Sequence, residues 1–126
     1  MKYSIEIIIN LPREEVIEKM DNPDNLKHWQ KGKRDMTLIE TILKRNFPEE
    51  FHATYDTKGV HNIQNNYFEE LDDIRTKWIS ESEFQFSGSG MKLMGWLMPG
   101  AFKKQSKKYM NDFKNFAEKG ISVANK

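Results

Sequence analysis

The feature that most constrains this chain is a run from residue 51 to 86 that is rich in β-branched and aromatic residues. Such residues favour extended strands, and turn-forming residues interrupt the run at intervals typical of strand length. Lys58-Gly59 is the signal of a tight two-residue turn, and Asp72-Asp73 marks a second connection. This part of the sequence therefore predicts three consecutive antiparallel strands.

The N-terminal third adds one strand and two short helices. Residues 2–10 alternate, with Tyr3 and Ile5 on the same face, which predicts a half-buried strand. Residues 11–20 predict a helix with Pro12 at its first position, and Val16 lies on its apolar stripe. Asn22 is the expected N-cap of the second helix. A further strand is expected at Met36–Lys44.

Residues 101–120 form the clearest helical pattern in the chain. Phe102, Tyr109, Phe113 and Phe116 fall on one face of a helix, and Gly120 is its natural C-terminal cap. The expected order is a strand, two short helices, a run of antiparallel strands and a long amphipathic helix. That order predicts an α+β fold with helices on one face of an antiparallel sheet.

Composition narrows the classes of function. The chain has 126 residues, which favours a single domain over 1–126, and it has no cysteine, which excludes disulfides and thiolate sites. Its net charge of +1 argues against a nucleic-acid partner. No signal-peptide pattern and no bilayer-spanning apolar run is visible, so we expect a cytoplasmic protein without stable membrane insertion.

Four stretches resemble one superfamily. They are "INLPREEVIEKMDNPDNLKHWQ", "RNFPEEF", "YFEELDDIRTKWISESEF" and "MPGAFKKQSKKYMNDFKNFAE". Together they resemble the START-like or SRPBCC superfamily, which includes polyketide cyclase/dehydrase and lipid-transport proteins. The resemblance implies a helix-grip fold, in which a curved antiparallel sheet wraps around a long C-terminal helix and encloses an apolar cavity. The superfamily includes transporters, sensors and enzymes, so the fold alone does not decide the function.

Strand register predicts which residues face that helix. A two-residue turn at Lys58-Gly59 places Thr57 opposite Val60, and we expect Phe68 to lie near Thr76 on the next strand. The opposite face, with His52, Thr54, Asp56, His61, Asn65, Arg75, Lys77, Glu81 and Glu83, should meet solvent. The predicted ligand-binding residues are Phe51, Tyr55, Asn62, Gln64, Asn66, Trp78, Ser80, Ser82 and Phe84 from the sheet, with Phe102, Tyr109 and Phe113 from the helix.

The amides and hydroxyls on this inward face suit a small-molecule cavity better than a dry core. Alternatively, they bond to one another or to buried water. The function predicted is non-catalytic binding of an apolar or amphipathic small molecule, lipid-like or polyketide-like. The alternatives are a cyclase, dehydratase or hydrolase using the same cavity, and an interaction module with a filled core. His28, His52 and His61 lack metal-ligand spacing, and we expect no catalytic residue, metal or cofactor.

The segment "MKLMGWLMPG" precedes the long helix and lies close to a cluster of lysines. One interpretation is a mobile gate with weak contact to a membrane surface, where lysines meet anionic headgroups. The other is an apolar segment packed into the core beside a solvated helix face. The sequence favours the second.

Only Lys31–Arg34 separate the second helix from the next strand, where START-like sheets normally have two more strands. Two strands with their turns would need roughly 15–20 residues. Either a stretch is missing between Gln30 and Lys31, or the sheet is natively short and Met36–Lys44 is an open edge. An open edge predicts a homodimer that pairs or covers it.

Overall fold

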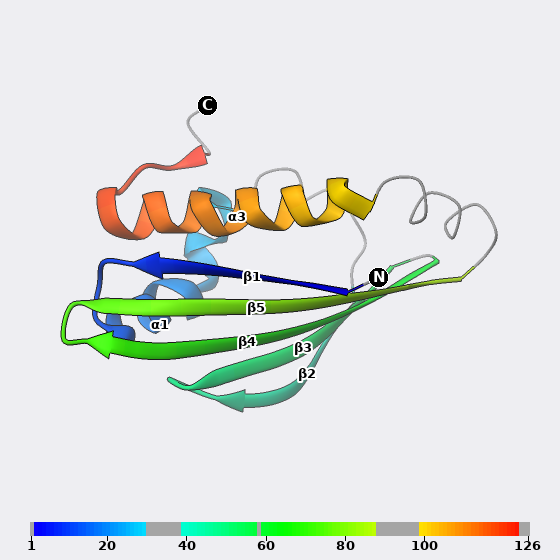
Figure 1. Cartoon of the computed structure of the whole chain (residues 1–126), viewed down its shortest axis with the longest axis horizontal. Helices are drawn as coiled ribbons and strands as arrows, with labels where there is room; N and C mark the ends of the chain where they lie inside the picture. Colours follow the sequence, from blue (N-terminus) through cyan, green and yellow to red (C-terminus); the bar gives the residue numbers. More distant parts are fainter. Residues whose placement is uncertain (1, 30–38, 58, 88–98, 124–126) are drawn as a thin grey trace.

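The computed structural model describes residues 2–29, 39–57, 59–87 and 99–123 (Figure 1). Its strands form a curved antiparallel sheet of five strands in the order β1-β5-β4-β3-β2, and a long C-terminal helix packs on one face. The fold is the α+β helix-grip arrangement expected from the sequence. The elements are β1 (Lys2–Ile9), α1 (Arg13–Asp21), the 3₁₀ helix η1 (Pro23–His28), β2 (Ile39–Asn46), β3 (Glu50–Thr57), β4 (Val60–Asp72), β5 (Arg75–Phe86) and α3 (Pro99–Lys119).

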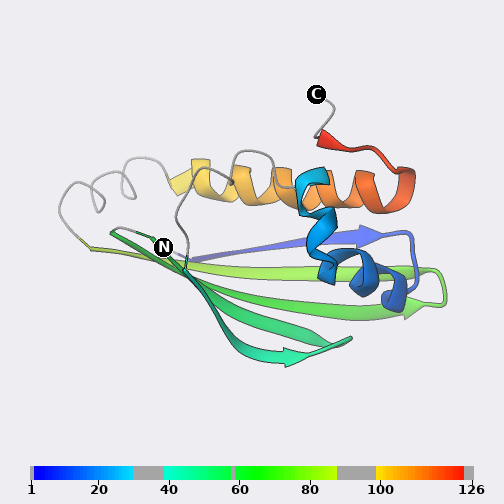
Figure 2. The same ribbon diagram turned by 180° about the vertical axis from the view of Figure 1, so that it is seen from behind.

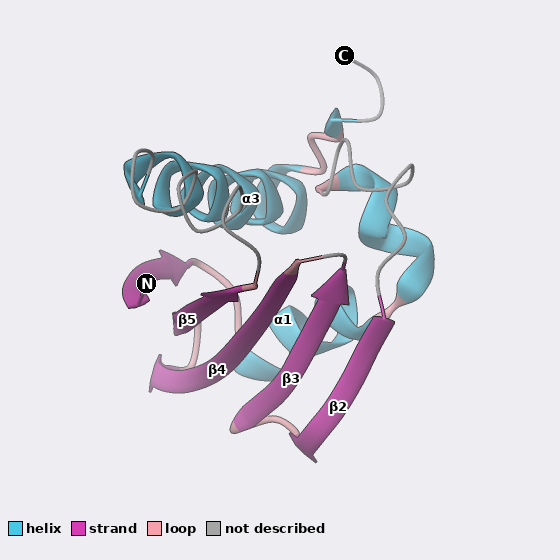
Figure 3. Cartoon of the chain, turned by 90° about the vertical axis from the view of Figure 1, so that its right-hand side faces the viewer, coloured by secondary structure: helices cyan, strands magenta, loops and turns pink. Residues whose placement is uncertain are grey.

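The helix does not cover the sheet evenly. α3 packs mainly on β1, and the sheet curves so that β3 and β2 lie further from it (Figures 1 and 3). The two short helical segments α1 and η1 lie near the C-terminal end of α3, as the view from behind also shows (Figure 2). One side of the layer between sheet and helix is therefore closed by direct packing, whereas the other is bounded by several separate elements.

The strand register agrees with the sequence analysis at the first hairpin and differs at the second. Thr57 pairs with Val60, as the tight turn predicts. Phe68 pairs with Trp78 instead of Thr76, a shift of two residues from the expected register. The turn is centred one residue later than that register requires: Asp72 pairs with Arg75, and the Asp72 carboxylate accepts a hydrogen bond of 2.9 Å from the Ile74 backbone N–H. A shift of two residues preserves the side-chain face, so the inward set is unchanged.

The local signals at the start of η1 and the end of α3 are confirmed, with one difference in helix type. Pro12, expected at the first helical position, is instead the N-cap of α1, which begins at Arg13. The side chain of Asn22 accepts a hydrogen bond of 3.0 Å from the Asp24 backbone N–H, which is the expected cap. The segment that follows is a 3₁₀ helix, tighter than the helix expected there. Gly120 ends α3 with a φ of 69°, in the left-handed region that glycine adopts without strain.

The main core lies where β1, β4, β5, α1 and α3 meet. Val16 and Phe113 are fully buried there, and Phe116 packs at its margin against the His28 ring at 4.9 Å. The buried members of this cluster are Ile5, Ile9, Val16, Trp29, Phe68, Trp78, Met110, Phe113 and Ala117. This cluster fixes the distance between the sheet and α3 at the end where α1 lies.

The outer face of the sheet is less solvent-exposed than expected. His52 and Thr54 were expected in solvent, but both are buried. The His52 ring forms hydrogen bonds with Asn65 at 2.8 Å and Glu50 at 2.7 Å, and it contacts Tyr67 edge-on at 5.1 Å. Long polar and aromatic neighbours on β3 and β4 therefore cover His52, which a pattern of alternating faces does not reveal.

Three expectations fall on other parts of the chain. The junction of Gln30 with Lys31, the first residues of the strand predicted at Met36–Lys44, and most of "MKLMGWLMPG" lie outside the described residues. The strand that is described, β2, extends two residues beyond Lys44. Within the described part of the chain, β2 is an edge of the sheet and pairs with β3 alone.

Candidate ligand-binding cavity

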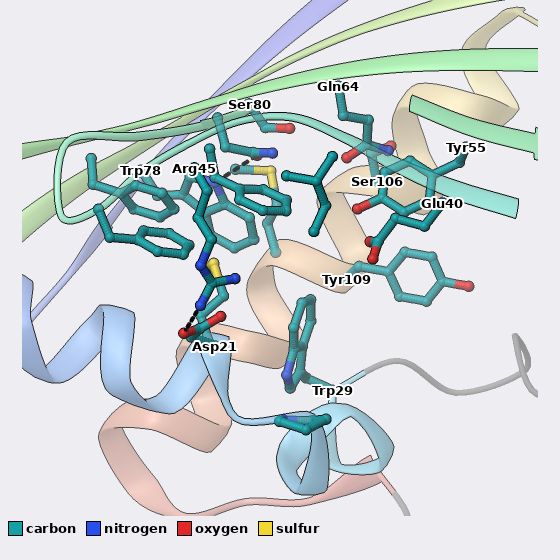
Figure 4. A pocket seen from close by; sticks show the side chains of 18 residues that line it. Asp21, Trp29, Glu40, Arg45, Tyr55, Gln64, Trp78, Ser80, Ser106 and Tyr109 are labelled. Carbon is teal, nitrogen blue, oxygen red and sulfur yellow. Dashed lines mark hydrogen bonds and ion pairs between the residues drawn. The ribbon is translucent and has the colours of Figure 1, made fainter. Parts of the chain in front are cut away.

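A cavity of about 380 Å³ lies between the inner face of the sheet, α3 and the α1–η1 segment (Figure 4). Its position follows from the curvature of the sheet, because β2 and β3 lie away from α3 and leave space that side chains fill only partly. Its wall consists of Met20, Asp21, Pro23, Trp29, Glu40, Ile42, Arg45, Phe47, Phe51, Tyr55, Gln64, Asn66, Phe68, Trp78, Ser80, Ser106, Tyr109 and Met110.

Aromatic rings form one end of the cavity. Phe47 stacks on Phe51 with ring centroids 5.5 Å apart, and Phe68 stacks on Trp78 at 6.2 Å. Trp29 contacts Trp78 edge-on at 6.4 Å, which brings η1 against the sheet. These contacts hold the rings in fixed orientations, so this end is largely preformed.

Several inward amides are paired with protein groups. The indole N–H of Trp78 donates to the Asn66 side-chain oxygen at 3.0 Å, and both residues are buried. Gln64 donates to the Asn62 side chain at 2.8 Å, and Asn62 donates to the Glu83 carbonyl at 3.1 Å. For these three amides, the expectation that inward polar groups bond within the protein is therefore confirmed. Their hydrogen bonds hold the side chains on the sheet side of the cavity in place.

An ion pair crosses the cavity from the sheet edge to α1. The Arg45 guanidinium, on β2, donates a hydrogen bond to the Asp21 carboxylate at the end of α1. The same guanidinium lies over the Phe47 ring at 4.9 Å from its centroid. Both charged groups are therefore engaged with each other, and Arg45 is also fixed by an aromatic face.

The other end of the cavity is polar. Tyr55 lies there with Glu40, Ser106 and Tyr109 (Figure 4). Burial raises the pKa of the Tyr55 hydroxyl above its usual value, and the charge of Glu40 and a hydrogen bond to its carboxylate raise this pKa further. Ser106 also bonds the Tyr3 hydroxyl at 2.6 Å, which ties α3 to β1. The cavity thus has an aromatic end and a hydroxyl- and carboxylate-bearing end.

The structure brings seven of the twelve predicted site residues to the cavity wall. They are Phe51, Tyr55, Gln64, Asn66, Trp78, Ser80 and Tyr109. Phe84 and Phe102 do not line it, because their rings pack on each other at 5.0 Å beyond its polar end. Asn62, Ser82 and Phe113 are also outside the wall, and Phe113 is fully buried against Trp29 at 5.1 Å.

Most of the wall that lies away from the central strands is not predicted by the sequence. Ser106 and Met110 are one helical turn apart and flank Tyr109, so the period of α3 could have identified them. On β2, Glu40 pairs with Tyr55 and Ile42 pairs with Ala53. These pairings could not be derived from the sequence, because β2 and β3 are not joined by a turn of defined length such as Lys58-Gly59 between β3 and β4. The contribution of α1 and η1 depends on how these segments pack, for which the sequence has no local signal.

Neither metal binding nor membrane spanning finds support in the described residues. No group of three or more histidine, cysteine, aspartate or glutamate side chains there is arranged to hold a metal ion. None of the described helices is both long and apolar enough to cross a membrane. The titratable groups on the cavity wall are Asp21, Glu40, Arg45 and the two tyrosines.

Known structures share this fold at low sequence identity. A conserved protein from Geobacillus kaustophilus aligns with a TM-score of 0.77 and 12% identity, covering 95% of this chain and 97% of that one. The Aha1 dimer from Colwellia psychrerythraea aligns at 0.67 and 12% identity, covering 95% and 98%. DynU16, from the dynemicin biosynthetic locus, aligns at 0.66 and 13% identity, covering 96% of this chain and 48% of that one. No family model and no curated protein matches the sequence. These similarities establish the fold and no more.

Proposed function

We propose that this protein binds a small apolar or amphipathic molecule in the cavity between the sheet and α3, and that it does so without catalysing a reaction. The observation that carries the proposal is a preformed cavity of about 380 Å³ with an aromatic end and a polar end. Its volume lies in the range of small-molecule sites, about 300–1,000 Å³. The sequence motifs and the fold together support placing the chain, as one domain, in the START-like superfamily.

The aromatic end supports an apolar ligand. Water beside the faces of Phe47, Phe51 and Trp78 gains no hydrogen bonds from the rings, so its displacement by a hydrocarbon group is favourable, by roughly 25 cal/mol for each Å² of apolar surface removed from water. The wall does not need to reorganise much, since ring contacts and the Trp78–Asn66 hydrogen bond already fix it. A preformed wall lowers the entropic cost of binding.

The enzyme alternative depends on a group that exchanges protons with the ligand. Asp21 is engaged by Arg45, which leaves Glu40 beside Tyr55 as the pair at which such an exchange could occur. Glu40 is exposed on an edge strand and lies at the polar end, away from the aromatic rings against which an apolar substrate would be held. This arrangement favours binding over catalysis, and ligand recovered chemically unchanged would support it.

The direct experiment is native mass spectrometry of the purified protein, followed by extraction and identification of any compound that co-purifies. In parallel, a fluorescent apolar probe should bind and change the emission of the two cavity tryptophans, Trp29 and Trp78. Protein without a co-purified compound that also fails to bind the probe would contradict the proposal.

A matched pair of variants tests where the probe binds. Gln64→Leu places a branched apolar side chain on the cavity wall and should weaken probe binding while the fold is retained. Gln85→Leu makes the same chemical change on the exposed outer side of β5 and should leave binding unaltered. Equal effects of both substitutions would show that the probe does not occupy this cavity.

We further propose that two copies associate through β2. Ile42 and Leu43 are 48% and 61% exposed on this edge strand, and the structurally similar Aha1 from Colwellia psychrerythraea is a dimer. The ladder between β2 and β3 is irregular between Ile42 and Lys44. Such irregularities shorten the stretch that can pair with another edge, so the contact should be small. Because Glu40, Ile42 and Arg45 line the cavity, a partner there would cover its open side.

A further inference from the structure

We propose that the cavity selects amphiphiles with a positively charged head group, which the carboxylate of Glu40 holds at the polar end while the apolar part lies against the aromatic rings. This inference rests on the proposed function and adds the chemical class of the ligand. It follows from the charges on the cavity wall, from how they are engaged, and from which end of the cavity carries them.

Three charged side chains line the cavity, and two of them neutralise each other. Arg45 forms an ion pair with Asp21 and lies over the Phe47 ring. A ligand carboxylate would have to compete with Asp21 for this guanidinium and would leave the Asp21 charge without its partner. The remaining charge on the wall is the carboxylate of Glu40. The net charge of the wall is therefore negative.

Glu40 is placed to receive a head group. It lies with Tyr55, Ser106 and Tyr109 at the end of the cavity away from Trp78 and Arg45 (Figure 4). The Tyr55 side chain lies beside it on the wall, where burial and the neighbouring Glu40 carboxylate raise the pKa of the tyrosine hydroxyl. A carboxylate can accept about four hydrogen bonds, so capacity remains for an ammonium group, which only donates.

Basic residues outside the wall do not neutralise Glu40 directly. Lys19, in the last turn of α1, is not part of the wall. The basic residues of α3 lie elsewhere, since Lys103, Lys104, Lys107 and Lys108 are exposed and are not part of the wall. Their attraction for anions acts through solvent and is screened by salt within about 10 Å at 0.1 M.

The test compares three probes with the same alkyl chain and different heads: decylammonium, decanol and decanoate. Isothermal titration calorimetry at moderate salt should give the affinity order decylammonium, then decanol, then decanoate. Because Glu40 is exposed, each step should be modest, about fivefold, as for ion pairs near a protein surface. Equal affinities, or tighter binding of decanoate, would overturn the inference and leave the cavity as a binding site.

Three variants identify the group responsible. Glu40→Gln should reduce the difference between decylammonium and decanoate to about twofold, and Glu40→Lys should reverse the order. Glu69→Gln is the control, because it removes the same charge from the outer face of β4, where the Glu69 Oε2 atom lies 3.9 Å from the Lys77 Nζ atom. This variant should keep the affinity order of the unaltered protein. A preference for decanoate that disappears in Arg45→Gln would assign the head group to Arg45 and overturn the proposal. Failure of all three probes and of the fluorescent probe would overturn the proposed function itself.

Discussion

The hydrogen bond between Trp78 and Asn66 offers a test of whether the inward amides stabilise the sheet. The substitution Trp78→Phe keeps an aromatic ring and removes the indole N–H, whose donor–acceptor distance to Asn66 is 3.0 Å. Trp78 is 5% exposed and Asn66 is 8% exposed, so the amide oxygen loses its protein partner in a nearly closed environment. We expect a clear loss of stability without loss of the fold.

The magnitude follows from two contributions. An unsatisfied buried polar group costs about 1–3 kcal/mol, and the lower part of that range applies because Asn66 lines a cavity that water can enter. The smaller ring also loses contact with Phe113, at 5.6 Å, and with Trp29, which adds about 1 kcal/mol. The free energy of unfolding should therefore fall by about 2 kcal/mol, or about 8 °C in Tm for a chain of this length.

The assay is urea denaturation followed by far-ultraviolet circular dichroism, since tryptophan emission is itself altered by the substitution. Asn66→Leu, which leaves the indole N–H without its partner, provides the second arm of a double-mutant cycle. The double variant should lose about 1 kcal/mol less than the sum of the single losses, because removing both partners leaves no orphaned group. Additive losses, or a cost of Trp78→Phe below about 0.5 kcal/mol, would refute the assignment of a structural role to this pair.

Four further outcomes are expected. Hydrogen bonds from Lys44 and His52 lower the pKa of Glu50 from 4.5 to about 2. The stability that the ionised Glu50 contributes is therefore complete above pH 4.5 and is lost as the pH falls toward 2. The free energy of unfolding of Glu50→Gln should depend less on pH in that interval. Gly120→Ala should lower the free energy of unfolding by about 1 kcal/mol, measured by thermal unfolding, because alanine is strained at a φ of 69°. The added Cβ meets no atom within 4 Å, so no steric clash adds to this cost. If β2 is a dimer contact, light scattering should show association that rises with concentration and is lost in Leu43→Lys, whereas a monomer at high concentration would end that proposal. If the exposed lysines of α3 and the segment before it contact anionic lipid, vesicle sedimentation should show binding that salt weakens, and no binding at low salt would leave only a solvated helix face.

The sequence was most informative where local chemistry fixes geometry. Lys58-Gly59 allows one tight turn, so the pairing of β3 with β4 could be derived residue by residue and is confirmed. The amphipathic period of α3 and the cap at Gly120 are likewise local properties. The predicted pairing of β4 with β5 differs from the observed register by two residues. The turn at Asp72 and the irregularity between Glu70 and Asp72 have no sequence signal as clear as that of the first turn.

The cavity was only half predictable for a different reason. Its sheet wall follows from strand alternation, which survives a shift of two residues. Its remaining walls come from α1, η1 and β2, and their positions depend on how layers pack, not on any local sequence signal. The pairing of Asp21 with Arg45 illustrates this, because it joins two elements whose separation in space is set by the curvature of the sheet. The charge of the wall, and hence the class of ligand proposed, could not be derived before that curvature was known.

The position of β1 has a consequence for how the chain folds. β1 is at one edge of the sheet and pairs only with β5 within the described residues, although β5 begins at Arg75 and most of the chain lies between them. The hairpins of β2 to β5 close short loops, whereas joining β1 to β5 closes a long one and is expected to occur late. During synthesis the isoleucine-rich β1 would emerge before β5 and lack this pairing until β5 has been made. Substitutions in β1 should therefore increase the unfolding rate more than they slow folding, and this strand should be the part of the nascent chain most in need of protection from aggregation.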